Sequence, residues 1–293
     1  MAMAQLAEEA GMAAADPTAA GVPQEPVPRG AALMRWGLPV LFGAIILGGW
    51  ELFVWYKINV DGIGHYNHIL PAPTTIATAL FEDWQILAPG WVTTMWITAQ
   101  ALFWAVVLGV GLAIAFSLSK WIEYSFFPYA VVLQVTPIVA IAPLIITLLN
   151  DLDTALLVCA WIVAFFPILS NTIIGLRSVD HGLLDLYQMY GASRWRVMVD
   201  LRLPSALPFF LAALKISAGL SLIGAVVGEF VAYGQSPGLA ARIVEASYLL
   251  KVPRMFAALV LISLTGILLF LLFSLISNLA LRSWHDSAVK RER

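Results

Sequence analysis

The sequence is poor in charge. Only 12% of its 293 residues are charged and 61% are hydrophobic, whereas a soluble domain carries about 25% charged residues. This deficit excludes an ordinary water-soluble globular protein. The net charge of -2 gives no overall positive field, so we expect no nucleic acid among the partners.

The residues of a catalytic or metal centre are also missing. The single cysteine, Cys159, lies in an apolar run and can form no disulfide within the chain. The four histidines are scattered without metal-ligand spacing, at His65, His68, His181 and His285. No Gly-x4-Gly-Lys-Ser/Thr phosphate loop is present, so the chain is not expected to bind ATP in that way. We therefore expect no catalytic residue, no metal and no cofactor on this chain, which argues against a membrane enzyme.

What the sequence does contain is long uncharged runs. A hydrocarbon core about 30 Å thick needs roughly 20 apolar residues in a helix. Six segments qualify or nearly qualify: 36–56, 91–118, 126–149, 154–175, 207–232 and 255–281. The predicted fold class is therefore an all-α integral membrane protein with about six transmembrane helices.

The third run, 126–149, contains Pro128, Pro137 and Pro143. Three prolines cannot all lie in a regular helix without freeing backbone carbonyls, so a kink or break is expected. Broken helices commonly line a transport path. Pro137 and Pro143 are therefore candidate path residues, and a plain packing kink is the alternative.

Two acidic residues fall within predicted spans. A charged side chain at the bilayer centre costs about 2.5–3.5 kcal/mol on insertion scales, so Glu229 should face a cavity or a partner. It is either a path or gate residue or a structural cap or loop contact. For Glu51 we expect an interhelix hydrogen bond. Segment 65–87 is predicted to form a short amphipathic surface helix, and 233–254 a Gly-punctuated loop.

The two ends of the chain differ from the rest. Residues 1–32 are rich in Ala, Pro and Gly, without an apolar core or a secretory signal pattern. We expect a retained, disordered cytoplasmic tail over 1–32, a transmembrane domain over 33–284, and a basic cytoplasmic tail over 285–293.

The cations predict the orientation, because Lys and Arg accumulate on the cytoplasmic side. With six spans, eleven cations share the side of the two termini: Arg29, Arg35, Lys120, Arg177, Arg194, Arg196, Arg202, Arg282, Lys290, Arg291 and Arg293. Four share the other side: Lys57, Arg242, Lys251 and Arg254. Both termini and the loop 176–205 are therefore predicted to be cytoplasmic, and segments 57–90 and 233–254 external.

The loop 176–205 is long for a connection between helices, and such loops are usually functional or disordered. It carries apolar and aromatic residues, at Leu183, Leu184, Tyr187, Met189 and Tyr190. Gly191 permits a sharp turn. We predict a short helix offered to a cytoplasmic partner. The alternative is a solvated loop that rests on the membrane.

This loop resembles the EAA loop of the membrane subunits of ATP-binding cassette (ABC) importers. The family pattern is Glu-Ala-Ala, three residues, Gly, nine residues, an aliphatic residue, one residue, then Leu-Pro. The spacing matches from Gly191 to Leu201 and on to Leu203 and Pro204. The departures are Asp185, Leu186 and Tyr187, which replace the Glu and the two Ala.

The resemblance extends over roughly residues 69–284. Segments 70–73, 136–144, 165–172, 175–180 and 191–195 are similar to the branch that imports nitrate, sulfonates, taurine, bicarbonate and pyrimidine-type vitamin precursors. Segment 224–230, with Trp284 and His285, is most similar to the vitamin or pyrimidine-precursor permeases. The substrate implied is a small organic or anionic solute, with a pyrimidine or vitamin precursor as the first expectation.

Such a resemblance implies a type I ABC importer permease in a bacterial inner membrane. It implies a homodimer, two copies of a separate ATPase that hold ATP and Mg²⁺, and a periplasmic or extracellular substrate-binding protein. The residues expected to couple to the ATPase are Asp185, Leu186, Tyr187, Gly191, Ala192, Ser193, Arg194, Leu203 and Pro204. Those expected at the translocation path or gate are Pro137, Pro143, Asn171 and Glu229.

An ATPase-independent secondary transporter or channel is the alternative function. A relay of intramembrane acids would favour it. Here Glu229 is nearly alone within the predicted spans.

Overall fold

A computed structural model describes residues 31–63, 66 and 69–282. The predictions for residues 1–30, His65, His68, Trp284, His285 and the basic tail 285–293 lie outside the described residues. The chain divides into two compact units, residues 1–50 and 51–293, and each is described by itself.

Helix α2 (Ala31–Asn59) supplies the described part of the first unit. It begins two residues inside the segment predicted as a tail, so the helix starts slightly earlier than expected. Nearly all side chains from Gly37 to Gly49 are exposed, although most are apolar. An exposed apolar helix of this length suits a lipid environment, in which the backbone hydrogen bonds are satisfied within the helix.

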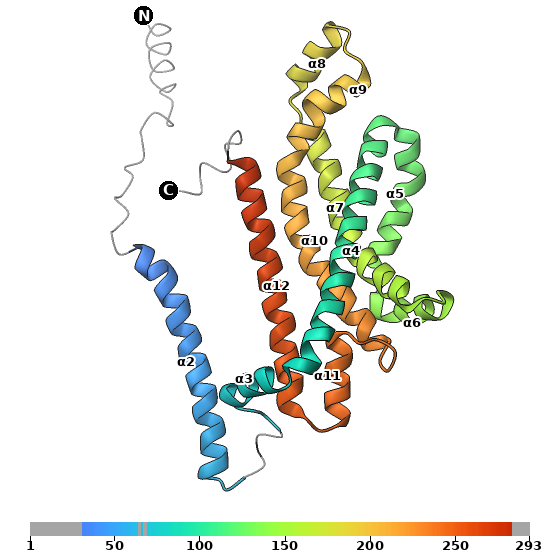
Figure 1. Cartoon of the computed structure of the whole chain (residues 1–293). Helices are drawn as coiled ribbons and strands as arrows, with labels where there is room; N and C mark the ends of the chain where they lie inside the picture. Colours follow the sequence, from blue (N-terminus) through green and yellow to red (C-terminus); the bar gives the residue numbers. More distant parts are fainter. Residues whose placement is uncertain (1–30, 64–65, 67–68, 283–293) are drawn as a thin grey trace, which may run out of the picture. The chain divides into compact units, whose positions relative to one another are not determined.

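In the described part of the second unit, every secondary-structure element is a helix (Figure 1). The end of α2 belongs to it as well. Its elements, in chain order, are α3 (Pro73–Glu82), α4 (Trp84–Leu118), α5 (Lys120–Val135), α6 (Ile138–Leu148), α7 (Leu152–Arg177), α8 (His181–Met189), α9 (Arg194–Val197), the π-helix η2 (Met198–Arg202), α10 (Leu203–Val231), α11 (Leu239–Tyr248) and α12 (Val252–Leu281). The predicted all-α class is confirmed.

Among the described residues, five helical segments are long and apolar enough to cross a membrane: α2 from Gly37, α4, α7, the run from α9 through α10, and α12. A sixth span results if α5 and α6 are counted together, although they bend by 106°. The bend falls at Thr136 and Pro137, so the predicted break in the third run is confirmed. The Thr147 hydroxyl donates to the Pro143 carbonyl at 2.7 Å, inside α6.

Two surface segments differ from the sequence prediction. The amphipathic helix expected over 65–87 is divided at Asp83, and the residues from Trp84 onwards continue into the long α4. The segment 233–254, predicted as a loop, contains α11. Its Leu239, Ala240, Ala241 and Ala246 are buried, so tertiary packing stabilises a helix where the glycines indicated only turns.

The core forms where α7 packs between α4 and α10. Small residues allow close approach: a Cβ at Gly224 would lie 2.7 Å from the Cα of Ala160, and one at Gly175 would lie 2.7 Å from the Cα of Ala206. The Ser217 hydroxyl of α10 donates to the Ala164 carbonyl of α7 at 2.9 Å. These contacts are typical of membrane helix packing, in which close van der Waals contact replaces the hydrophobic effect.

Within residues 51–293, α8 and α9 lie at one end of the bundle and α3, α6 and α11 at the other (Figure 1). At the second end, the Arg254 guanidinium donates to both oxygens of Asp83, at 2.7 and 2.5 Å. These hydrogen bonds and the positive charge hold the pKa of Asp83 below its ordinary value. Glu51 accepts from the Thr74 hydroxyl at 2.7 Å and from its N–H at 3.2 Å, so the predicted interhelix hydrogen bond is confirmed.

Candidate docking loop and buried carboxylate

The loop between α7 and α10 contains a short, well-capped helix. Asp180 Oδ1 accepts from the Gly182 N–H at 2.6 Å and caps the start of α8. At the other end, Gly191 has φ +67°. The Gly191 N–H donates to the Gln188 carbonyl at 2.9 Å, and the Ala192 N–H to the Tyr187 carbonyl at 3.0 Å. This pair of bonds is a Schellman motif with glycine in the left-handed position.

The turn predicted at Gly191 is therefore confirmed, and the need for glycine comes from the backbone. A Cβ built on Gly191 meets no atom within 4 Å. A left-handed backbone, rather than close packing within this chain, disfavours larger residues there.

Helix α8 buries none of its residues, yet it carries large apolar side chains. Leu183, Leu186 and Tyr190 follow the i, i+3, i+7 spacing of one helical face and are 47%, 45% and 83% exposed. Met189, beside them, is 85% exposed. The segment is an ordered helix with an uncovered apolar face, which is not what a merely solvated loop would present.

Both ends of the loop are fixed to the helical bundle. On one side, Arg177 at the end of α7 donates to Glu123 of α5 at 2.5 Å. On the other, Arg202 Nη1 donates to the Ser117 carbonyl at 3.2 Å and to its hydroxyl at 2.5 Å, at the end of α4. Met198 is fully buried. These contacts attach the start of the loop to α5 and its end to the end of α4.

The residues predicted to couple follow one another along this segment. Asp185 and Leu186 are exposed on α8, and Tyr187 is half-buried. After Ala192, the Ser193 hydroxyl accepts from the Arg196 N–H at 3.3 Å, which caps α9. Leu203 and Pro204 begin α10, and a proline in the first helical turn loses no hydrogen bond. Arg194, the first residue of α9, is exposed.

At the opposite end of α10, Glu229 is completely buried. It accepts from the Thr94 hydroxyl at 2.7 Å and from the Ala240 N–H at 3.0 Å. The Thr94 oxygen accepts in turn from the Leu239 N–H at 3.0 Å. The carboxyl group and the threonine thus satisfy backbone donors in the first turn of α11, as side-chain caps do elsewhere.

A glycine completes this arrangement. A Cβ at Gly238 would overlap the Glu229 carboxyl group, so only glycine leaves it room. The surroundings of Glu229 favour the structural contact, which was the alternative to a path or gate role. The path or gate role stays a prediction.

The other three predicted path residues lie elsewhere. Pro137 and Pro143 are exposed on and next to α6, and the Asn171 amide donates to the Pro167 carbonyl of its own helix at 2.9 Å. None of the hydrogen bonds of the described residues joins any two of Pro137, Pro143, Asn171 and Glu229. Their path assignment stays a prediction.

Several residues that shape these two sites were not singled out from the sequence: Thr94, Ser117, Glu123 and Gly238. Serine and threonine inside apolar runs carry no distinguishing pattern. For Gly238 the sequence does contain an indication. Pro237-Gly238 comes directly before a run in which Arg242 and Glu245 share one face of a helix, so a helix start at Gly238 was predictable.

Known proteins are similar in sequence to this chain over most of its length. Residues 105–285 match the family described as "Binding-protein-dependent transport system inner membrane component". The riboflavin transport system permease protein of Chloroflexus aurantiacus is 32% identical over an alignment of 265 residues, and the match covers 89% of this chain and 96% of that protein. The formylaminopyrimidine transport permease protein of Halalkalibacterium halodurans is 28% identical over 83% of this chain and 94% of its own length.

A solved structure of an amino acid ABC transporter has the same fold. Its TM-score is 0.58 at 19% sequence identity, and the match covers 70% of this chain and 97% of that chain.

Proposed function

Because this chain belongs to the family of binding-protein-dependent transport system inner membrane components, we propose that it moves a small nitrogen heteroaromatic solute, such as a vitamin or pyrimidine precursor. It is a multi-pass inner membrane protein and a permease subunit of an ABC importer. The substrate class is supported by the relatives named for riboflavin and formylaminopyrimidine transport, which share a nitrogen heteroaromatic ring. Nitrate, sulfonates and taurine are the competing substrates.

The ATPase docks on α8. The observation that carries this assignment is the uncovered apolar face of α8, formed by Leu183, Leu186, Met189 and Tyr190. An exposed apolar patch surrounded by polar residues is typical of a protein interaction site. ATP and Mg²⁺ belong to the partner, since this sequence has no phosphate loop, and hydrolysis takes place there.

The assembly contains two copies of this permease and two of the ATPase, with the solute path on the two-fold axis. An external substrate-binding protein delivers the solute. Closure of the two ATPases displaces the α8 helices. The Arg177–Glu123 and Arg202–Ser117 contacts then pass this displacement to the helices that line the path.

Replacing Met189 with glutamate should weaken ATPase binding. A buried apolar contact at an interface often contributes more than about 1 kcal/mol, so at least about fivefold less ATPase should co-purify with the permease. Met189→Leu should retain binding. Val199→Glu, on η2 and also exposed, should have little effect, which controls for the added charge.

Equal ATPase recovery with Met189→Glu and the wild-type permease would contradict docking on α8. Solute uptake that persists without any ATPase would instead support a secondary transporter or channel.

The orientation of the chain is testable with reporter fusions. Fusions at Asp61 and Ser236 should report an external location, and fusions at Lys120, Asp180 and the C-terminus a cytoplasmic one. The reason is the excess of eleven cations over four on one side. An external signal at Asp180 would exclude α8 from contact with a cytoplasmic ATPase.

A further inference from the structure

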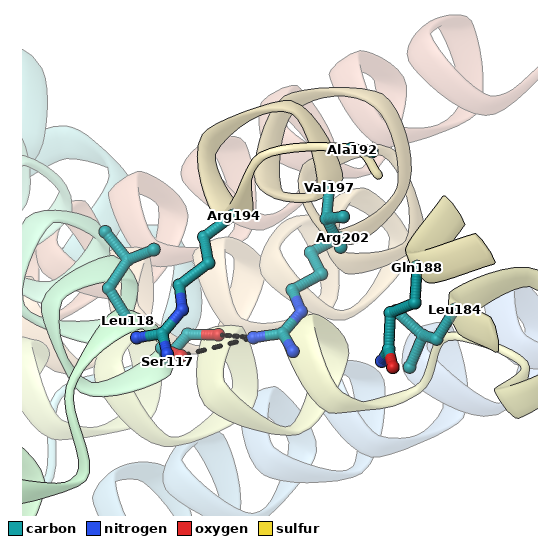
Figure 2. Close-up of a pocket in the computed structure, with 8 residues that line it drawn as sticks. All are labelled: Ser117, Leu118, Leu184, Gln188, Ala192, Arg194, Val197 and Arg202. Carbon is teal, nitrogen blue, oxygen red and sulfur yellow. Dashed lines mark hydrogen bonds between the residues drawn. The ribbon is translucent and has the colours of Figure 1, made fainter. Parts of the chain in front are cut away.

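A pocket of about 440 Å³ lies behind α8, between this helix, α9 and the end of α4. Its polar lining consists of Ser117, Gln188, Arg194 and Arg202. Figure 2 shows Arg194 and Arg202 extending toward Ser117, with Gln188 reaching in from α8. The pocket is separate from the apolar face proposed to receive the ATPase.

The pocket is electropositive. Two guanidinium groups line it, and among the described residues no acidic side chain does. Arg202 uses Nη1 on Ser117, which leaves its other donors available. The Arg194 guanidinium has no hydrogen bond or ion pair among the described residues, whereas nearby Arg196 pairs with Asp200 at 3.4 Å. Two converging guanidinium groups without a counter-charge suit a phosphate, which accepts bidentate hydrogen bonds from arginine.

The rest of the lining and the neighbouring surface indicate the level of the pocket in the membrane. Leu118, Leu184 and Val197 give it an apolar side. Just after Leu118, Trp121 and Tyr124 of α5 are 77% and 75% exposed. Exposed tryptophan and tyrosine gather at the headgroup level of a bilayer. A basic pocket with an apolar wall at this level matches a phospholipid in both charge and depth.

We propose that this pocket binds the headgroup phosphate of an anionic phospholipid, held by Arg194 and Arg202 with Gln188 as a further donor. The bound phosphate connects α8 and α9 to the end of α4, so anionic lipid stabilises the position of the loop relative to the bundle. Every group that forms the site belongs to this chain. Because Ala192 and Arg194 are also predicted to couple to the ATPase, the site is tested first on the permease without its partner.

Titration of the purified full-length permease with phosphatidylglycerol, followed by native mass spectrometry, tests the assignment. A basic residue near the membrane contributes about 1 kcal/mol to binding anionic lipid. Arg194→Gln should therefore weaken phosphatidylglycerol binding about fivefold. Arg196→Gln, on the same short helix but outside the pocket, removes the same charge and should change the affinity much less. Phosphatidylcholine should bind more weakly to the wild-type protein.

Competition with inorganic phosphate distinguishes the source of the ligand. If millimolar phosphate displaces the lipid and binds with the same dependence on Arg194, the lipid assignment is overturned and the ligand is free phosphate from solution. Retention of phosphatidylglycerol at that phosphate concentration supports the lipid. Equal losses with Arg194→Gln and Arg196→Gln would overturn the pocket, because they would show only general surface attraction. Unchanged phosphatidylglycerol binding by Arg194→Gln would also overturn it. An effect of Arg194→Gln seen only with the ATPase bound would overturn it too, because it would indicate a protein carboxylate as the occupant of the pocket.

Discussion

Gly191→Val should uncouple the permease from its ATPase while leaving it folded in the membrane. The backbone at this position has φ +67°, a region that costs a residue with a side chain roughly 1–2 kcal/mol and a β-branched residue more. Helix α8 has only 9 residues and depends on its caps, because isolated helices of this length are marginal. Loss of the Schellman bonds at Tyr187 and Gln188 should release the end of the helix.

The measurement is co-purification of the ATPase and its substrate-stimulated hydrolysis, which should fall by roughly thirtyfold, equivalent to about 2 kcal/mol. Gly191→Asn is the matched control, since asparagine tolerates the left-handed region better than other residues, and it should retain most of the coupling. Unchanged ATPase binding and hydrolysis with Gly191→Val would show that residues 183–195 are not the docking helix.

Glu229→Leu should release α11. Leucine removes the acceptor of the Ala240 N–H and a partner of the Thr94 hydroxyl, and an unsatisfied buried donor costs about 1–3 kcal/mol. Hydrogen exchange of the amides in 239–248 should accelerate by about fivefold to 150-fold, the range that corresponds to this cost. Glu229→Gln retains an acceptor oxygen and should preserve most of the protection. Glu229→Asp should transport better than Glu229→Leu.

Gly238→Ala provides an independent route to the same state, because its Cβ would overlap the Glu229 carboxyl group. Gly219→Ala, in the same α10 as Glu229 but with nothing within 4 Å of the added Cβ, should leave α11 unchanged. If Glu229→Leu abolishes transport while the exchange of 239–248 stays as in the wild type, Glu229 acts in the translocation path and not as a structural contact.

The fold class followed from short-range information. A span of a bilayer requires about 20 consecutive apolar residues, and this requirement is visible in the sequence without any knowledge of packing. The break at Thr136 and Pro137 was equally predictable, because proline removes a backbone donor wherever it lies. The positive φ of Gly191 was predictable in the same way, since the requirement for glycine comes from the residue's own backbone.

The contacts that organise the two sites depend on residues distant in the sequence. Thr94 and Glu229 lie 135 residues apart, and Ser117 and Arg202 lie 85 apart. A buried threonine in an apolar run has the same local pattern whether or not it meets a carboxyl group. Helix α11 was missed for the same reason, because its stability comes from burial of Leu239 and its neighbouring alanines and not from a long periodic run.

The sequence by itself determined that the chain crosses a membrane several times, where the chain bends, and which loop presents a short helix. These properties depend on the composition and backbone preferences of adjacent residues. Only the tertiary structure decided what Glu229 contacts, that Arg194 and Arg202 converge on one pocket, and that Leu183, Leu186, Met189 and Tyr190 remain uncovered. Burial and pairing are properties of what lies opposite a residue, and the packing of α4, α7 and α10 brings those opposite groups together.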